Sequence, residues 1–163
     1  MGPVQRTRAS LRITGDDLIP DEVTRVLGCN PSRAHKKGDV IRNEKLRSER
    51  VARFGMWSIQ ATPCSPGDID AQVKDLLGKL SSDLAAWRDL TSRFHADLFC
   101  GLFLAELNQG LTISADTMAA LSSRGIELDL DIYSHAKDDQ PNKAPEPTTT
   151  AVTSPAAQEP RQL

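Results

Sequence analysis

The chain has few of the residues that carry most catalytic and metal-binding chemistry. Its 163 residues include three cysteines and three histidines, and no CxxC, HxH or HExxH motif brings any of them together. The odd number and wide spacing of Cys29, Cys64 and Cys100 argue against a disulfide framework. We therefore expect reduced thiols in a cytoplasmic protein, without a metal site or a cofactor.

Sequence motifs of common enzyme classes are also missing. The chain contains no GxSxG nucleophile elbow, no Walker loop and no GxGxxG dinucleotide fingerprint. Nothing in it therefore supports hydrolase, nucleotide or dinucleotide chemistry, and no residue is predicted to be catalytic. The sequence favours a protein that is not an enzyme.

Long hydrophobic runs and aromatic residues are scarce as well. The longest apolar run, residues 98–105, is too short to span a bilayer, and the first ten residues lack the apolar segment of a signal peptide. Two tryptophans, one tyrosine and four phenylalanines are few for a surface that stacks single-stranded bases. We therefore expect no membrane partner, and nucleic acid is disfavoured as a partner.

The periodicity of the apolar residues predicts one α+β domain over residues 9–136. Alternation predicts strands, and apolar spacings of three and four predict helices. The expected strands are 10–14, 39–42, 51–62, 96–105 and 126–133, with helices at 20–27, 68–92 and 114–123. This order predicts a ferredoxin-like βαββαβ core with an added helix and strand.

Several finer expectations follow from the same pattern. The polar segment 29–49 is predicted to be a long loop with at most one short strand. The Leu- and Phe-rich segment 96–105 is expected to be a central strand covered on both faces. Trp57 and Trp87 lie in line with the apolar faces of their elements, so we expect both in the core.

Both ends of the chain are predicted to lie outside the domain. Residues 1–8 are expected to be flexible. Residues 137–163 are rich in Pro, Thr and Ala and have no apolar period, which predicts a disordered tail.

Two charged segments are candidate binding surfaces. In the last expected strand, the apolar residues point one way and the polar ones the other, namely Glu127, Asp129, Asp131 and Tyr133. Three carboxylates along one flat strand are more typical of a solvated face than of an acid–base cleft.

The second charged segment, 33–53, is basic and includes Arg33, Lys36 and Lys37. It is typical of a solvated loop or of a loop that pairs with the acidic strand of its own fold, and it is also able to contact phosphates.

Three stretches together resemble a known family. These are SLRITGDDLIPDEVTRVLGCNPSRAHKKGD, then GMWSI, and finally ELDLDIY. With them the chain resembles the bacterial domain of unknown function numbered 4279 over residues 9–134. The resemblance implies an α+β domain of unassigned activity.

Three functional hypotheses remain open from the sequence. The first is a non-catalytic protein-binding module, for instance an immunity protein that neutralises a toxin. The second is a small-molecule or hydrolytic enzyme with a site between the 31–38 loop and the last strand, where Arg33 clamps an anion and Asp129 or Asp131 acts as base. The third is nucleic-acid binding through the basic segment 33–53.

Overall fold

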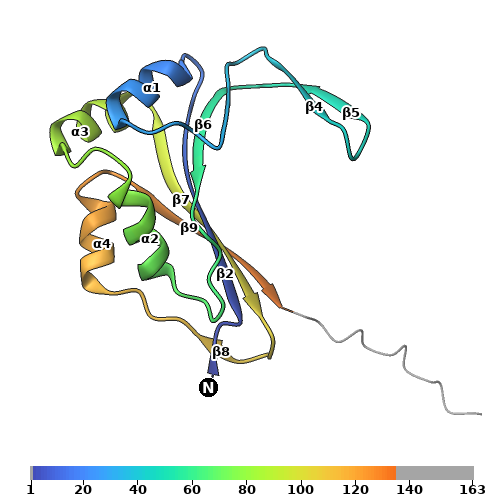
Figure 1. Ribbon diagram of the computed structural model, residues 1–163, viewed down its shortest axis with the longest axis vertical. Coiled ribbons are helices and arrows are strands. Elements are labelled where there is room, and N and C mark those ends of the chain that lie inside the picture. Colours follow the sequence, from blue (N-terminus) through green and yellow to red (C-terminus); the bar gives the residue numbers. More distant parts are fainter. Residues whose placement is uncertain (1, 135–163) are drawn as a thin grey trace, which may run out of the picture.

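The computed structural model describes residues 2–134 (Figure 1), so the predicted tail at 137–163 lies outside the described residues. An α+β fold is confirmed. The helices are α1 (Pro20–Leu27), α2 (Ile69–Gly78), α3 (Leu84–Arg93) and α4 (Ala115–Ser122). The strands are β1 (Gly2–Pro3), β2 (Arg6–Gly15), β3 (Arg33–His35), β4 (Val40–Asn43), β5 (Ser48–Val51), β6 (Gly55–Gln60), β7 (His95–Leu104), β8 (Gln109–Gly110) and β9 (Glu127–Ser134).

The main sheet has five strands in the order β3-β6-β2-β7-β9. Its neighbouring strands are antiparallel except β7 and β9, which are parallel and are connected through α4. The ferredoxin-like topology is not evident as predicted, because its expected second strand, 39–42, lies in the separate β4–β5 hairpin and not in the main sheet. In the main sheet, β6 lies between β2 and β3, the two strands that flank α1, and is antiparallel to both.

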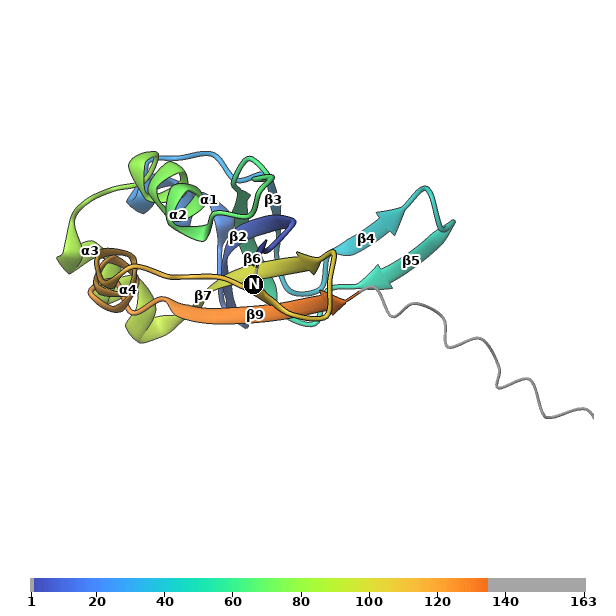
Figure 2. The ribbon, with the colours of Figure 1, turned by 90° about the horizontal axis from the view of Figure 1, so that it is seen from below.

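All four helices lie on one side of the sheet (Figures 1 and 2). Alternate residues of the central strands, such as Leu11, Ile13 and Leu98, point to that side and are buried in the core. The expectation that segment 96–105 is covered on both faces is wrong. Phe99 and Phe103 alternate to the other face of β7, where they are only partly buried.

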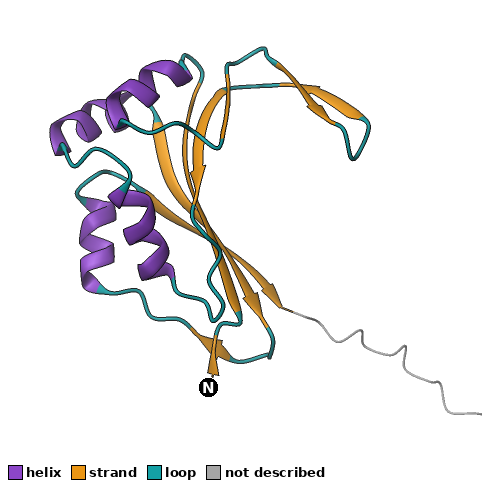
Figure 3. Ribbon diagram, viewed as in Figure 1, coloured by secondary structure: helices purple, strands orange, loops and turns teal. Residues whose placement is uncertain are grey.

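Both tryptophans are buried core residues, as predicted. The Trp57 indole donates a hydrogen bond to the Thr24 hydroxyl at 3.0 Å, and that of Trp87 donates to the Ser81 carbonyl at 2.8 Å. The helix predicted at 68–92 is two helices (Figure 3). The break occurs where Asp83 caps α3 by accepting hydrogen bonds from two backbone N–H groups.

Two segments predicted to lack structure are ordered in strands. Residues 2–3 pair with β8, and β2 already begins at Arg6, so residues 2–8, which were predicted to be flexible, belong to the fold. The predicted loop contains β3 and most of the β4–β5 hairpin. Val51 belongs to this hairpin and not to β6. We call residues 40–51 the arm, which projects on the side opposite the helices (Figures 1 and 2).

Candidate functional site

The candidate site is the face of the five-stranded sheet that no helix covers, which we call the open face. Strand alternation and register determine which side chains it carries. Its charged and aromatic members are Arg6, Arg8, Arg12, Arg33, His35, His95, Asp97, Phe99, Phe103, Glu127, Asp129, Asp131 and Tyr133. Along the strand order, arginines on β3 and β2 give way to carboxylates on β7 and β9.

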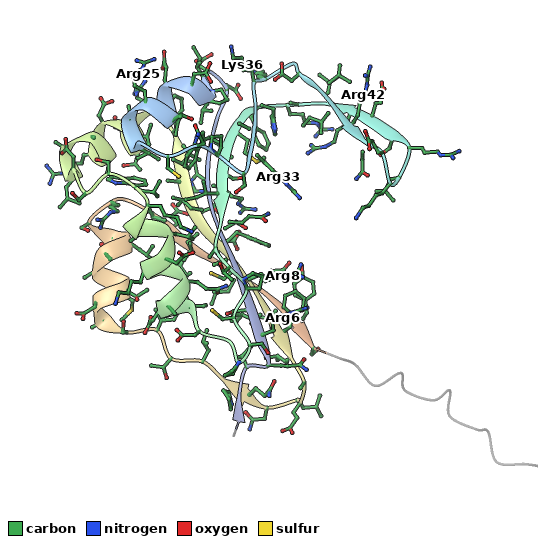
Figure 4. All side chains as sticks on the ribbon, viewed as in Figure 1. Arg6, Arg8, Arg25, Arg33, Lys36 and Arg42 are labelled. Carbon is green, nitrogen blue, oxygen red and sulfur yellow. The ribbon has the colours of Figure 1, made fainter. Side chains whose placement is uncertain are left out.

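At the basic end, the arm and the sheet enclose a groove of about 1310 Å³. Arg33 and His35 line it from β3, Met56 lines it from β6, and Ile41 and Arg50 line it from the arm. Figure 4 shows Arg33, Arg8 and Arg6 on the arm side of the sheet. Burial lowers the pKa of His35, and the nearby charge of Arg50 lowers it further. The lining of the groove carries more positive than negative side chains, namely Arg33, Arg42, Lys45 and Arg50 against Asp39 and Glu44.

Lys36 and Lys37, which were predicted as binding residues, lie in the turn between β3 and the arm. The ammonium of Lys37 forms an ion pair with Asp16 at 2.7 Å, and this hydrogen bond raises its pKa. The backbone N–H of Lys36 donates to the Asp39 carboxylate at 2.7 Å. These contacts hold the turn that leads into the arm.

The centre of the open face is an ion-pair cluster around Arg12. Its Nε donates to the buried Asp97 at 2.7 Å, and a terminal nitrogen of the same guanidinium donates to Asp129 at 3.1 Å. The guanidinium carbon lies 4.4 Å from the ring centre of Phe99, within cation–π distance. Arg12 therefore joins β2, β7 and β9 across their exposed side.

An aromatic stack lies further along β7 and β9. The rings of Phe103 and Tyr133 are nearly parallel, with centres 4.9 Å apart. The Arg6 guanidinium lies 4.2 Å from the Phe103 centre and comes from β2, on the other side of β7 from Tyr133. Both faces of the Phe103 ring are therefore occupied. The Tyr133 hydroxyl donates to Asp131, which raises the pKa of the tyrosine.

The predicted basic and acidic residues share the open face but not one pocket. Arg33 is on β3 and Asp131 is on β9, the two outer strands, with three strands between them. At about 4.8 Å per strand step, these backbones are about 19 Å apart. The enzyme site that would join them does not form, and the basic segment does not pair with the acidic strand.

Sequence reasoning missed the part of the site supplied by β2 and β7. Arg6, Arg8 and Arg12 occupy alternate positions of one strand, a signal that the sequence contained. Phe99 and Phe103 stand out in the sequence, but a strand that is apolar on both faces predicts a covering layer over them.

Within residues 2–134, no three His, Cys, Asp or Glu side chains are grouped as metal ligands. No helix in this range combines the length and apolar character needed to cross a membrane.

Comparison with known proteins identifies the family. No match was found among curated proteins or among solved structures. Residues 5–135 match the family model described as a domain of unknown function (DUF4279). This match covers the β2 and β9 strands that carry the ion pairs and the aromatic stack, and it confirms the resemblance found in the sequence. The chain belongs to the DUF4279 family.

Proposed function

We propose that the chain is a non-catalytic protein-binding module whose partner docks on the open face and in the groove beneath the arm. The observation that carries this proposal is the uncovered face itself. A sheet normally buries its apolar side chains against another layer, but here Met56, Phe99 and Phe103 are partly exposed on the side without helices. An exposed surface with aromatic residues and arginines is typical of protein interfaces.

The chemistry of the face favours a protein over a nucleic acid. Both sides of the Phe103 ring are occupied, by Tyr133 and Arg6, so this ring is not available to stack on a base. The neighbouring carboxylates of Asp97, Asp129 and Asp131 repel phosphates.

The groove determines the orientation of the proposed partner. Arg33 and Arg50 offer guanidinium groups to acidic side chains, while Met56 and Ile41 offer apolar contacts between them. At the other end of the face, carboxylates attract basic side chains. A toxin neutralised by an immunity protein is one kind of partner with both charges, and the separated charges would steer and orient its approach.

The test is affinity purification of the tagged full chain from its native lysate at low salt. The groove variant is Arg33→Glu with Arg50→Glu. Its control is Lys74→Glu with Arg88→Glu, which changes the net charge equally on the helical side, where both residues are exposed. We expect a stoichiometric protein with the wild type and the control and a loss of it with the groove variant.

An empty eluate, or a protein that all three forms retain equally, would contradict the proposal. Nucleic acid in the eluate that the groove variant loses would support the nucleic-acid hypothesis instead.

A further inference from the structure

The outer strand β9 leaves half of its backbone hydrogen-bonding groups without a partner strand. Among the described residues, β9 pairs with β7 only, and it runs for eight residues. Every second residue of such an edge strand presents its backbone N–H and C=O outward. Proline, lysine and bulges commonly block pairing at such edges, and β9 contains no proline and no lysine. Its outer edge is therefore able to accept another strand.

The two sides of β9 differ in chemistry. On the helix side, Leu128, Leu130 and Ile132 are 36%, 42% and 60% exposed. Their neighbours on β7, Leu98, Cys100 and Leu102, are buried. The apolar stripe of β9 thus continues the core outward to an edge that the described residues leave uncovered. An added strand with apolar side chains on this side would extend the same core.

On the open face, β9 is acidic. Glu127, Asp129 and Asp131 alternate with the apolar stripe, and Asp97 of β7 lies opposite Glu127. Arg12 compensates Asp97 and part of Asp129. The carboxylates of Glu127 and Asp131 are not in any ion pair of the described residues. The acidic side therefore favours positively charged side chains on an added strand.

These charges argue against a second copy of the chain as the occupant. When two β9 strands pair antiparallel with their apolar stripes on one side, carboxylates face each other. A pairing centred on Leu130, for example, places Asp129 opposite Asp131 of the copy, and like charges at such positions are destabilising. The acidic residues thus disfavour self-pairing and favour a strand of opposite charge.

We infer that β9 is a strand-addition site for an extended segment of a partner protein in which apolar residues alternate with lysine or arginine. The apolar residues of the partner segment pack against Leu128, Leu130 and Ile132. The basic residues face Glu127 and Asp131, and the backbones hydrogen-bond along the edge. The inference rests on the proposed binding function, because it names the segment of the partner that the module takes.

The test is fluorescence anisotropy with labelled peptides of eight residues, the length of β9, and the full chain. One peptide alternates lysine with valine, and the other alternates glutamate with valine. We expect saturable binding of the lysine peptide and none of the glutamate peptide. For the variant Glu127→Gln with Asp131→Asn, the loss of two cross-strand charge pairs weakens binding about tenfold.

A matched control is Asp17→Asn with Asp21→Asn, which removes two exposed carboxylates that lie neither in β9 nor in the groove and is expected to leave binding unchanged. Two further lysine peptides carry N-methyl groups, either on every lysine amide or on every valine amide. Strand addition uses the N–H groups of only one set, so methylation of that set abolishes binding and methylation of the other does not.

Equal effects of the two methylated sets, or no binding of the lysine peptide, would overturn the inference. The groove variant Arg33→Glu with Arg50→Glu is expected to bind the lysine peptide at least as well as the wild type. If the groove variant loses the lysate partner and the wild-type chain does not bind the lysine peptide, the proposed function stands and only the strand-addition site is refuted.

Discussion

The ion pair of Arg12 with Asp97 offers a direct test of how burial determines the strength of a charge pair in this protein. A second pair, Arg42 with Glu49, has the same chemistry and nearly the same Nε–O distance, 2.8 Å against 2.7 Å. The environments differ. The side chains of Arg12 and Asp97 are 32% and 8% exposed, whereas those of Arg42 and Glu49 are 75% and 60% exposed.

The expected coupling energies follow from this difference. Water screens the arm pair, so its coupling should be at most about 0.5 kcal/mol. Asp97 is buried, and removal of Arg12 leaves its carboxylate with only the His95 imidazole, whose Nε2 lies 3.4 Å away. Loss of the charge partner costs several kcal/mol for a fully buried pair. Because a third of Arg12 is exposed, we reduce this to a coupling of about 2 kcal/mol.

The assay is a double-mutant cycle on each pair, with alanine substitutions and urea unfolding to measure the free energy of unfolding. The cycle removes the separate contributions of Asp129 and Phe99 to the effect of Arg12. Equal coupling energies for the two pairs would refute the reasoning, because distance alone would then determine the strength. A larger coupling in the arm would refute it more strongly.

Three further predictions concern stability, each measured by urea unfolding. Asp83→Ala removes the cap of α3 and should lower the free energy of unfolding by about 1 kcal/mol. Gly55→Ala should lower it by about 1 to 3 kcal/mol, because the new methyl would lie 2.6 Å from the Leu18 carbonyl oxygen, whereas Gly78→Ala has open space in α2 and should raise it by about 0.5 kcal/mol. Burial raises the pKa of Cys100 from 9.0 to about 12, so the unfolded state loses this proton at a lower pH than the folded state. The contribution of this thiol to the free energy of unfolding is therefore complete below pH 9 and declines toward pH 12. Cys100→Ala should flatten that decline. A rise with Gly55→Ala, no loss with Asp83→Ala, or an unchanged alkaline slope would contradict the respective account.

Local patterns in the sequence predicted most helices and strands because each pattern has a local cause. The alternation over 126–133 predicted β9 and the faces of its side chains. It did not show that β9 is an outer strand, so the exposure of Leu130 and Ile132 was not foreseen. The split of the long helix depends on Asp83, which competes locally for backbone N–H groups.

The sequence does not show that β3 joins the main sheet or that residues 40–51 form the arm, and the reason is a different one. Which strands pair is decided by contacts far apart in the chain, and two orders can share one succession of elements. The arm is a hairpin with no buried residue, so it has no apolar period against the core. The basic residues of its groove form a charged segment in the sequence, whereas Arg6 and Arg8 lie in residues 1–8, which the sequence predicts to be flexible.

The position of β2 has a consequence for synthesis on the ribosome. β2 is the first long strand of the chain and the central strand of the sheet, and it pairs with β6 on one side and β7 on the other. The nascent chain therefore holds one edge of β2 open until residue 104 has left the exit tunnel. Nascent fragments that end before β7 keep an arginine-bearing strand edge available to other molecules, which makes this stage of translation the one most dependent on chaperones.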